Sequence, residues 1–119
     1  QIIICRRDTL EKSEVSLDED VVSCVSTLLE NIQNNLYQRA KKRRDSMTYH
    51  AKNLEEIKKI MDTQPGFIYA PWCGDETCEL KMKEIKGLKS RCITEDNENE
   101  TCSICGKKSK HIVVWGIQY

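Results

Sequence analysis

Two close pairs of cysteines constrain this chain more than any other feature. Cys73 and Cys78 flank the four residues Gly-Asp-Glu-Thr. Cys102 and Cys105 flank Ser-Ile, about 23 residues further along the chain. Structural zinc binds four ligands tetrahedrally, and thiolates suit it best. The spacing therefore favours one structural zinc ion bound by these four thiolates.

The second pair carries the more specific signal. Gly106 follows Cys105, and the residue after the second cysteine of a zinc knuckle often needs the positive φ that glycine adopts without strain. Backbone N–H groups in such a turn also hydrogen-bond the thiolates. Lys107 and Lys108 come next and are placed to offset part of the negative charge of the site.

Other chemistry for the paired thiols stays open at this point. Two disulfides would use the same four residues, and either pair alone could form a redox centre. Seven cysteines are an odd number, and a chain rich in Lys and Glu favours a reducing compartment with metal-bound or free thiols. Neither pair forms a C-x-x-C motif that follows a strand and opens a helix, as a redox pair would. Four thiolates leave no open position for water, which argues against catalytic zinc.

The three other cysteines lie in apolar stretches of the sequence. We expect Cys5 and Cys24 to be small buried hydrophobic residues. Cys92 is closer to the paired cysteines along the chain, and it is the alternative fourth ligand.

Composition limits the core and therefore favours a metal. The chain has 119 residues, 39% of them hydrophobic, with a single Phe. A chain of this size buries little apolar area and often needs disulfides or a metal to stabilise it. The 19 basic and 19 acidic residues balance, so no global field attracts nucleic acid or a membrane.

The sequence predicts a cytoplasmic protein with no membrane segment. No run approaches the roughly 20 apolar residues that span a bilayer. The opening QIIICRRD has too short an apolar run for a signal peptide. Because it lacks an initiator Met, we expect a fragment of a longer protein.

Hydrophobic periodicity and turn residues predict an α+β fold. The expected elements are a strand at 2–5, a helix to about residue 44, a helix at 53–62, a strand at 67–72, a helix at about 76–86, and strands at 90–93 and 111–118. They form a small mixed sheet with helices and a zinc knuckle, preceded by a strand and a long amphipathic helix. A domain boundary is expected in 45–52, dividing the chain into 1–45 and 46–119.

Local signals define the helix starts. Ser16 and Glu19 form a capping box for the long helix, and Asn53 caps the second helix. The long helix carries an apolar face at Leu17, Val21, Cys24, Val25, Leu28, Ile32, Leu36 and Ala40. The stretch 94–100, with four acidic residues, is expected to be a loop.

No catalytic constellation is evident. His50 and His111 have no nucleophile or carboxylate arranged beside them, so His50 is expected in a loop and His111 at the start of a strand. Trp72, Trp115 and Tyr69 alternate with apolar strand residues, which favours the core over a base-stacking role.

A basic cluster at 38–44 has two interpretations. It is either a solvated helix end or a patch that contacts nucleic-acid phosphates. Its charged residues are Arg39, Lys41, Lys42, Arg43 and Arg44.

Several stretches together resemble the C-terminal end of prolyl-tRNA synthetase of the archaeal/eukaryote-like type. They are RRDT-x-EK (6–12), IQNNLYQRAKKRRD (32–45), GFIYAPWCGDETCELKMKE (66–84), SRCI (90–93), CSICGKKSKH (102–111) and the final Tyr119. The resemblance covers essentially the whole chain in order. It implies that 1–45 are the last strand and helix of an anticodon-binding domain. It also implies that 46–119 form a C-terminal zinc-binding domain with the four paired cysteines as ligands.

The resemblance also implies the activity of a parent enzyme. That enzyme, a homodimeric class II aminoacyl-tRNA synthetase, attaches proline to tRNA(Pro) using ATP and magnesium in a catalytic domain outside this chain. In the family, the carboxylate of the C-terminal tyrosine folds back toward that domain, which makes Tyr119 a candidate contact. Arg6, Arg7 and the basic cluster are candidate contacts to tRNA phosphates.

Two positions depart from the family pattern. Leu10 stands where the family usually has glycine, and Ile117 stands where a polar residue is more common. The alternative to the family reading is a free-standing zinc-knuckle module that binds nucleic acid or protein.

Overall fold

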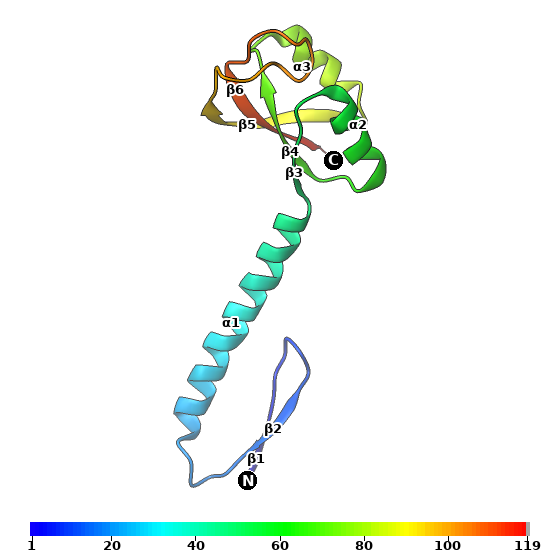
Figure 1. Ribbon diagram of the computed structural model, residues 1–119. Helices are drawn as coiled ribbons and strands as arrows, with labels where there is room; N and C mark the ends of the chain where they lie inside the picture. Colours follow the sequence, from blue (N-terminus) through cyan, green and yellow to red (C-terminus); the bar gives the residue numbers. More distant parts are fainter. Residues whose placement is uncertain (119) are drawn as a thin grey trace. The chain divides into compact units, whose positions relative to one another are not determined.

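The computed structural model describes residues 1–118, which divide into two units (Figure 1). The first unit is Gln1–Asp45, and the second begins at Ser46. The first contains β1 (Ile2–Cys5), β2 (Lys12–Val15) and all but the last residue of α1 (Val21–Ser46). The second contains β3 (Thr48–His50), α2 (Leu54–Thr63), β4 (Phe67–Trp72), α3 (Glu76–Lys83), β5 (Leu88–Asp96) and β6 (His111–Ile117). The predicted α+β class with a mixed sheet is confirmed.

The first unit is a hairpin and one helix. β1 and β2 pair antiparallel, with Ile2 opposite Val15. Sequence analysis predicted β1 but missed β2, because Lys-Ser-Glu-Val is mostly charged or polar and its strand character comes from pairing with β1. The turn between the strands places Leu10 at φ +64°. Glycine adopts this left-handed conformation without strain, whereas a residue with a Cβ such as leucine does not.

The predicted capping box of α1 is wrong. The helix begins at Val21, and the Asp20 carboxylate accepts a hydrogen bond from the Ser23 N–H at 3.1 Å. Aspartate caps helices as well as serine does, and Asp20 is closer to the apolar helix positions. The Ser16 hydroxyl instead accepts from the Asp18 N–H in the turn after β2. Leu17 is therefore outside the helix and is 67% exposed.

The second unit is built on a four-stranded sheet in the order β3-β4-β6-β5. β3 is parallel to β4, whereas β6 runs antiparallel to both of its neighbours. β3 was not predicted, because three residues carry no periodic pattern. β5 is longer than expected and includes the first three residues of the acidic stretch. α3 ends at Lys83, three residues earlier than predicted.

The cap of α2 is confirmed. Asn53 accepts a hydrogen bond from the Glu56 N–H at 2.9 Å, and Glu56 reaches back to the Lys52 N–H at 2.7 Å. The helix presents Ile57 and Met61, one turn apart, to the core. The sequence therefore predicted the start of this helix correctly.

The core of the second unit lies on one side of the sheet. Residues two apart in a strand point to the same side. One side contributes Ile68, Ala70, Val113 and Trp115 to a cluster with residues of α2 and α3. The core residues are Ala51, Ile57, Met61, Ile68, Ala70, Met82, Leu88, Val113 and Trp115. The opposite side carries Tyr69, Ile112 and Val114, none of which belongs to this cluster.

Candidate metal centre

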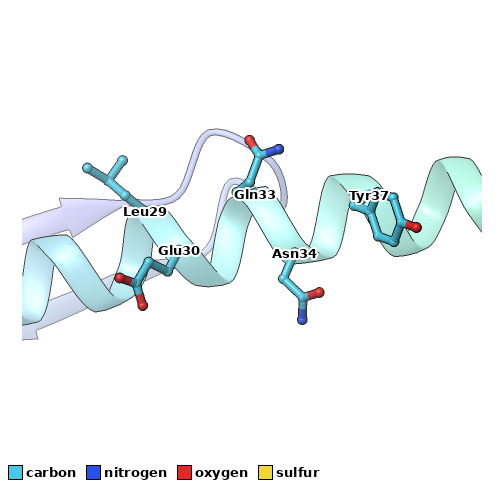
Figure 2. Close-up of a pocket in the computed structure, with 5 residues that line it drawn as sticks. All are labelled: Leu29, Glu30, Gln33, Asn34 and Tyr37. Carbon is cyan, nitrogen blue, oxygen red and sulfur yellow. The ribbon is translucent and has the colours of Figure 1, made fainter.

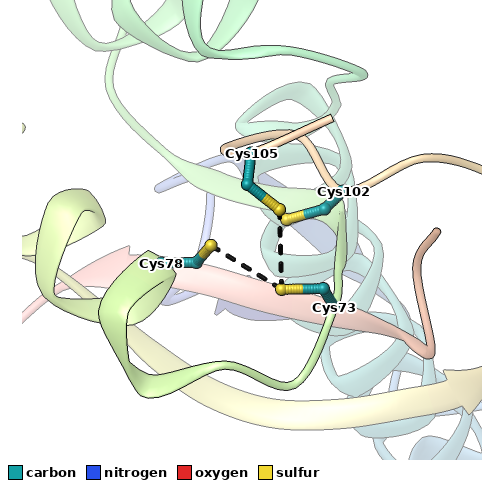
Figure 3. A group of neighbouring side chains, drawn as sticks. All are labelled: Cys73, Cys78, Cys102 and Cys105. Atoms are coloured by element: carbon teal, nitrogen blue, oxygen red, sulfur yellow. Dashed lines mark hydrogen bonds between the residues drawn. The ribbon is translucent and has the colours of Figure 1, made fainter. Parts of the chain in front are cut away.

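The four paired cysteines converge at one point in the second unit. Their sulfur atoms all lie within 4.8 Å of one another. Cys73 Sγ is 3.6 Å from Cys78 Sγ and 3.8 Å from Cys105 Sγ (Figure 3). A tetrahedral zinc ion with Zn–S bonds of about 2.3 Å places its sulfur ligands about 3.8 Å apart. The sulfur positions therefore fit a tetrahedral four-thiolate site.

The first pair is positioned by the end of β4 and the start of α3. Cys73 directly follows β4, and Gly74 turns the chain with φ +89°. Asp75 caps α3 by accepting from the Thr77 N–H at 2.9 Å. The helix then directs Cys78 back toward Cys73. The four residues between Cys73 and Cys78 thus contain a glycine turn and a helix cap.

The second pair lies in a tight turn between β5 and β6. The Cys102 N–H donates to the Lys107 carbonyl at 2.6 Å, and the Gly106 N–H donates to the Cys102 carbonyl at 3.0 Å. Thr101 and Lys108 form a β-bridge across the turn. Gly106 has φ +74°, as predicted for the residue after Cys105.

Ser103 ties this turn to the strand that carries the first pair, and sequence analysis did not identify it. Its N–H and its hydroxyl both donate to the carbonyl of Pro71, at 3.0 and 2.8 Å. The Lys110 N–H donates to the carbonyl of Trp72 at 2.8 Å. Because Ser103 is 5% exposed and fully bonded, it fixes the turn against β4. A serine between two ligand cysteines was the only sequence signal.

Burial and backbone hydrogen bonding have opposite effects on the pKa values of three of the clustered thiols. Cys78 and Cys102 are buried, whereas Cys105 is exposed. Burial raises the pKa of the Cys78 and Cys73 thiols. The backbone N–H of Lys107 lowers the pKa of Cys105 to about 7. A bound metal ion strongly favours the thiolate form. It would therefore offset the rise in pKa that burial causes at Cys73 and Cys78.

The lysines after the knuckle lie beside the cysteines, in a hollow that acidic residues share. Lys107 and Lys108 line it together with Asp75 and Glu76. Lys108 forms an exposed ion pair with Glu98 at 3.2 Å. The charge around the site is therefore mixed.

Cys5 and Cys24 do not match their expected burial, and Cys92 is not part of the sulfur cluster. Cys5 and Cys92 are exposed, and Cys24 is half-buried. The prediction of burial is wrong for Cys5, because β1 turns alternate residues outward and Cys5 falls on the exposed set. Cys92 lies on β5, an edge strand, and is not among the four clustered sulfurs.

The basic cluster lies on the last turns of α1. Arg39, Lys41, Lys42, Arg43 and Arg44 are all exposed. Successive residues are rotated by about 100° around a helix, so these side chains point in several directions and only part of the cluster can face one phosphate backbone. Arg44 also pairs with Asp45 at 3.0 Å.

Arg6 is committed to contacts within the first unit. Its guanidinium donates to Asp8 at 2.8 and 3.0 Å and to Asn31 of α1 at 3.0 Å. Asn35 donates to the same Asp8 carboxylate at 2.7 Å. These contacts make Arg6 a link between the hairpin turn and α1, which weakens its candidacy as a phosphate contact.

The aromatic and histidine residues occupy the sheet. Trp115 is fully buried, as predicted, and Trp72 packs against it edge to face at 6.5 Å. Tyr69 is half-buried and stacks on His50. His50 is the last residue of β3, so the prediction that it lies in a loop is wrong.

His111 begins β6, as predicted, and contacts Asp96 at 2.8 Å. Tyr119 lies outside the described residues.

α1 also carries an open hollow on its exposed surface. Leu29, Glu30, Gln33, Asn34 and Tyr37 line it, and Figure 2 shows their side chains projecting from the helix. Leu29 is 56% exposed and Tyr37 is 58% exposed.

No helix within residues 1–118 is long and apolar enough to cross a membrane.

The geometry defines the second unit as an α+β domain with a four-cysteine cluster suited to a structural metal. A sequence model described as "Prolyl-tRNA synthetase, C-terminal" matches residues 54–119. The chain belongs to this family, and the resemblance seen in its sequence is confirmed.

Relatives match the chain along its whole length. The proline–tRNA ligase of Clostridium novyi is 48% identical over 121 residues, and that of Clostridium botulinum strain Okra is 46% identical. Each match covers 100% of this chain and 25% of the relative. The chain therefore spans a quarter of the length of the curated relatives it matches. This whole-length match disfavours an unrelated free-standing knuckle module.

Solved structures give the same result. Prolyl-tRNA synthetase from Cryptosporidium parvum, in complex with halofuginone and AMPPNP, has a TM-score of 0.84 and 27% identity. The same enzyme with L-proline and AMP has a TM-score of 0.85 and 28% identity. Both comparisons cover 98% of this chain and 25% of the solved chain.

Proposed function

We propose that the chain serves as the C-terminal part of a proline–tRNA ligase and that its second unit is a domain stabilised by one zinc ion. Cys73, Cys78, Cys102 and Cys105 would hold the ion. The observation that carries this proposal is the convergence of the four sulfurs at spacings that suit tetrahedral zinc. With all four positions taken by thiolates, the zinc would supply folding energy and no catalysis.

The activity itself would belong to the parent enzyme. That enzyme would be a cytoplasmic, homodimeric class II ligase that attaches proline to tRNA(Pro) with ATP and magnesium in a catalytic domain outside this chain. The names of the curated relatives support the reaction. The AMPPNP, AMP and L-proline bound to the solved relative support the substrates.

The two units would have different positions in that enzyme. Residues 1–45 would complete the anticodon-binding domain, and residues 46–119 would brace it against the catalytic domain. The exposed apolar residues of α1 support the first assignment, since a helix that is part of a larger domain needs such a face for packing. Exposed positions such as Val22, Leu29 and Leu36 would be covered by the rest of that domain.

Contacts to tRNA and to the catalytic domain complete the proposal. Of Arg39, Lys41, Lys42, Arg43 and Arg44, those that lie on the side of α1 facing tRNA would supply phosphate contacts. Tyr119 would contact the catalytic domain through its carboxylate. Because phosphate contacts release counterions, reversing the charge of Arg39 or Arg43 should reduce the salt dependence of tRNA binding by the full enzyme.

Metal analysis tests the zinc assignment directly. The chain purified without chelator should contain one equivalent of zinc, and Cys102→Ser should lose it. Cys92→Ser is the matched control, because Cys92 lies outside the sulfur cluster, and it should retain the metal. Less than half an equivalent of zinc, together with intact disulfides by mass spectrometry, would overturn the proposal.

A further inference from the structure

A hollow of about 360 Å³ lies on the side of the sheet opposite the core. Tyr69 of β4 and Ile112 of β6 contribute to it from the sheet, and His50 joins them from the end of β3. None of these residues belongs to the core cluster or to the metal centre. The hollow is therefore a feature separate from the zinc proposal.

An aromatic pair forms part of its lining. The rings of His50 and Tyr69 stack with centroids 5.1 Å apart and planes 27° from parallel. The two residues are directly opposite each other in the parallel β3–β4 pairing, which places one ring against the face of the other. The outer face of such an aromatic stack can attract a flat cation through the ring quadrupole.

Two carboxylates without partners line the same hollow. The acidic stretch includes Asp96, which pairs with His111, and Glu98, which pairs with Lys108. Glu95 and Glu100 both line the hollow, and the described part of the chain offers neither side chain a hydrogen bond or an ion pair. The carboxylates left without partners are thus those that face the hollow.

The charge and shape of the lining select among ligands. Lys52 is the only ammonium group among the lining residues, so the two carboxylates outnumber it. This balance repels a phosphate backbone and therefore disfavours RNA. A lysine ammonium group would be attracted by the charge of the carboxylates, but it cannot stack on the rings as a planar group. A guanidinium is planar, stacks on aromatic rings and donates paired hydrogen bonds to carboxylates.

We propose that this hollow, formed by His50, Tyr69, Ile112, Glu95 and Glu100, is a docking site for an arginine side chain of a partner protein segment. The guanidinium stacks on the aromatic pair and donates to the two carboxylates. This inference goes beyond the proposed synthetase function and does not depend on it. The site is open to solvent, so a single arginine binds weakly.

Peptide titration of the zinc-loaded chain, followed by amide chemical shifts, tests the site. The probes are acetyl-Gly-Arg-Gly-amide and acetyl-Gly-Lys-Gly-amide, which have the same charge. The arginine peptide should shift the amides of residues 94–100 and bind about threefold tighter than the lysine peptide. Equal affinities, or no shifts at this face, would overturn the proposal. Displacement of the arginine peptide by short unstructured RNA would also overturn it.

Variants separate the two parts of the site. The double substitution Glu95→Gln and Glu100→Gln should weaken arginine binding about fivefold, because it removes both carboxylates. Tyr69→Leu should remove the preference for arginine over lysine. Glu98→Gln is the matched control in the same acidic stretch and should leave binding unchanged. Unaltered binding in the double variant would contradict the proposal, provided that the tryptophan fluorescence of the second unit reports an intact core.

Discussion

The two units of this chain are stabilised in different ways. In the second unit, the ten residues of α2 bury Ile57 and Met61 almost completely. In the first unit, the 26 residues of α1 bury only Ile32. The shorter helix thus belongs to a core and the longer one mostly does not. Helix length is therefore a poor guide to how firmly an element is held, whereas burial of its apolar face is a good one.

Polar contacts show the same contrast. The first unit relies on Asp8, whose side chain is fully buried and accepts hydrogen bonds from Arg6 and Asn35. The second unit combines an apolar core with a cluster of four thiols. Both tryptophans, Trp72 and Trp115, belong to the second unit. Their fluorescence therefore reports on that unit alone, while far-ultraviolet circular dichroism is dominated by α1.

Loss of a metal ligand should have the largest effect. Cys102→Ser is expected to unfold the second unit, because the binding free energy of a structural zinc, about 10 kcal/mol or more, is folding free energy. The tryptophan emission should shift to that of exposed indole while most of the helical signal of α1 remains. Simultaneous loss of both signals would show that the two units fold as one. Cys92→Ser should leave both signals unchanged.

A core substitution should have a smaller effect that is still confined to one unit. Ile57→Ala removes a fully buried side chain and should lower the free energy of unfolding of the second unit by about 3 kcal/mol. Leu29→Ala, on the exposed face of α1, should change stability by no more than about 0.5 kcal/mol. Urea denaturation followed by fluorescence and circular dichroism measures both. Similar losses of unfolding free energy in the two variants would contradict the proposed difference between the buried face of α2 and the exposed face of α1.

Acid should weaken the contact between the hairpin and α1 in the first unit. Hydrogen bonding from Arg6 holds the pKa of the Asp8 carboxyl well below its usual range. A carboxyl with a lowered folded-state pKa stabilises the fold above its unfolded pKa, about 3.9, and this contribution is lost as the pH falls further. The contact between hairpin and α1 should therefore loosen below about pH 4, as seen in amide chemical shifts. Asp8→Asn should weaken that contact at pH 7 and remove most of its pH dependence.

The smallest expected effect is a gain of stability at the hairpin turn. Leu10 adopts φ +64°, which costs a residue with a Cβ about 1 kcal/mol. Leu10→Gly should relieve this strain and stabilise the first unit by about that amount, with no change in tryptophan fluorescence. Hydrogen exchange of the hairpin amides measures the difference. Thr9→Gly is the control, since Thr9 is not among the residues with positive φ, and it should give no gain.

Local chemistry made part of the fold predictable. The Asn53 cap and the apolar spacing of α2 act within a few residues, so the sequence predicts them well. β2 and β3 were missed because their strand character comes from their partners. The start of α1 was misplaced because Ser16 and Asp20 are both good caps and only the observed hydrogen bonds distinguish them.

The candidate site likewise has features that the sequence predicted and features that it did not. Spacing alone identified the four clustered cysteines and the turn at Gly106. The anchoring of Ser103 to Pro71 joins residues 32 positions apart, which no local pattern reveals. Nor could the sequence show that Glu95 and Glu100 line a hollow with Tyr69, because that proximity depends on the order of the strands.

The position of β6 has a consequence for how the domain is made. β6 lies between β4 and β5, yet it comes after both in the chain. During translation, all four clustered cysteines leave the ribosome before this central strand does. The nascent chain can therefore gather its sulfur ligands while the sheet is still divided. Metal binding at that stage would hold β4 and the knuckle together until β6 is inserted and joins the two halves of the sheet.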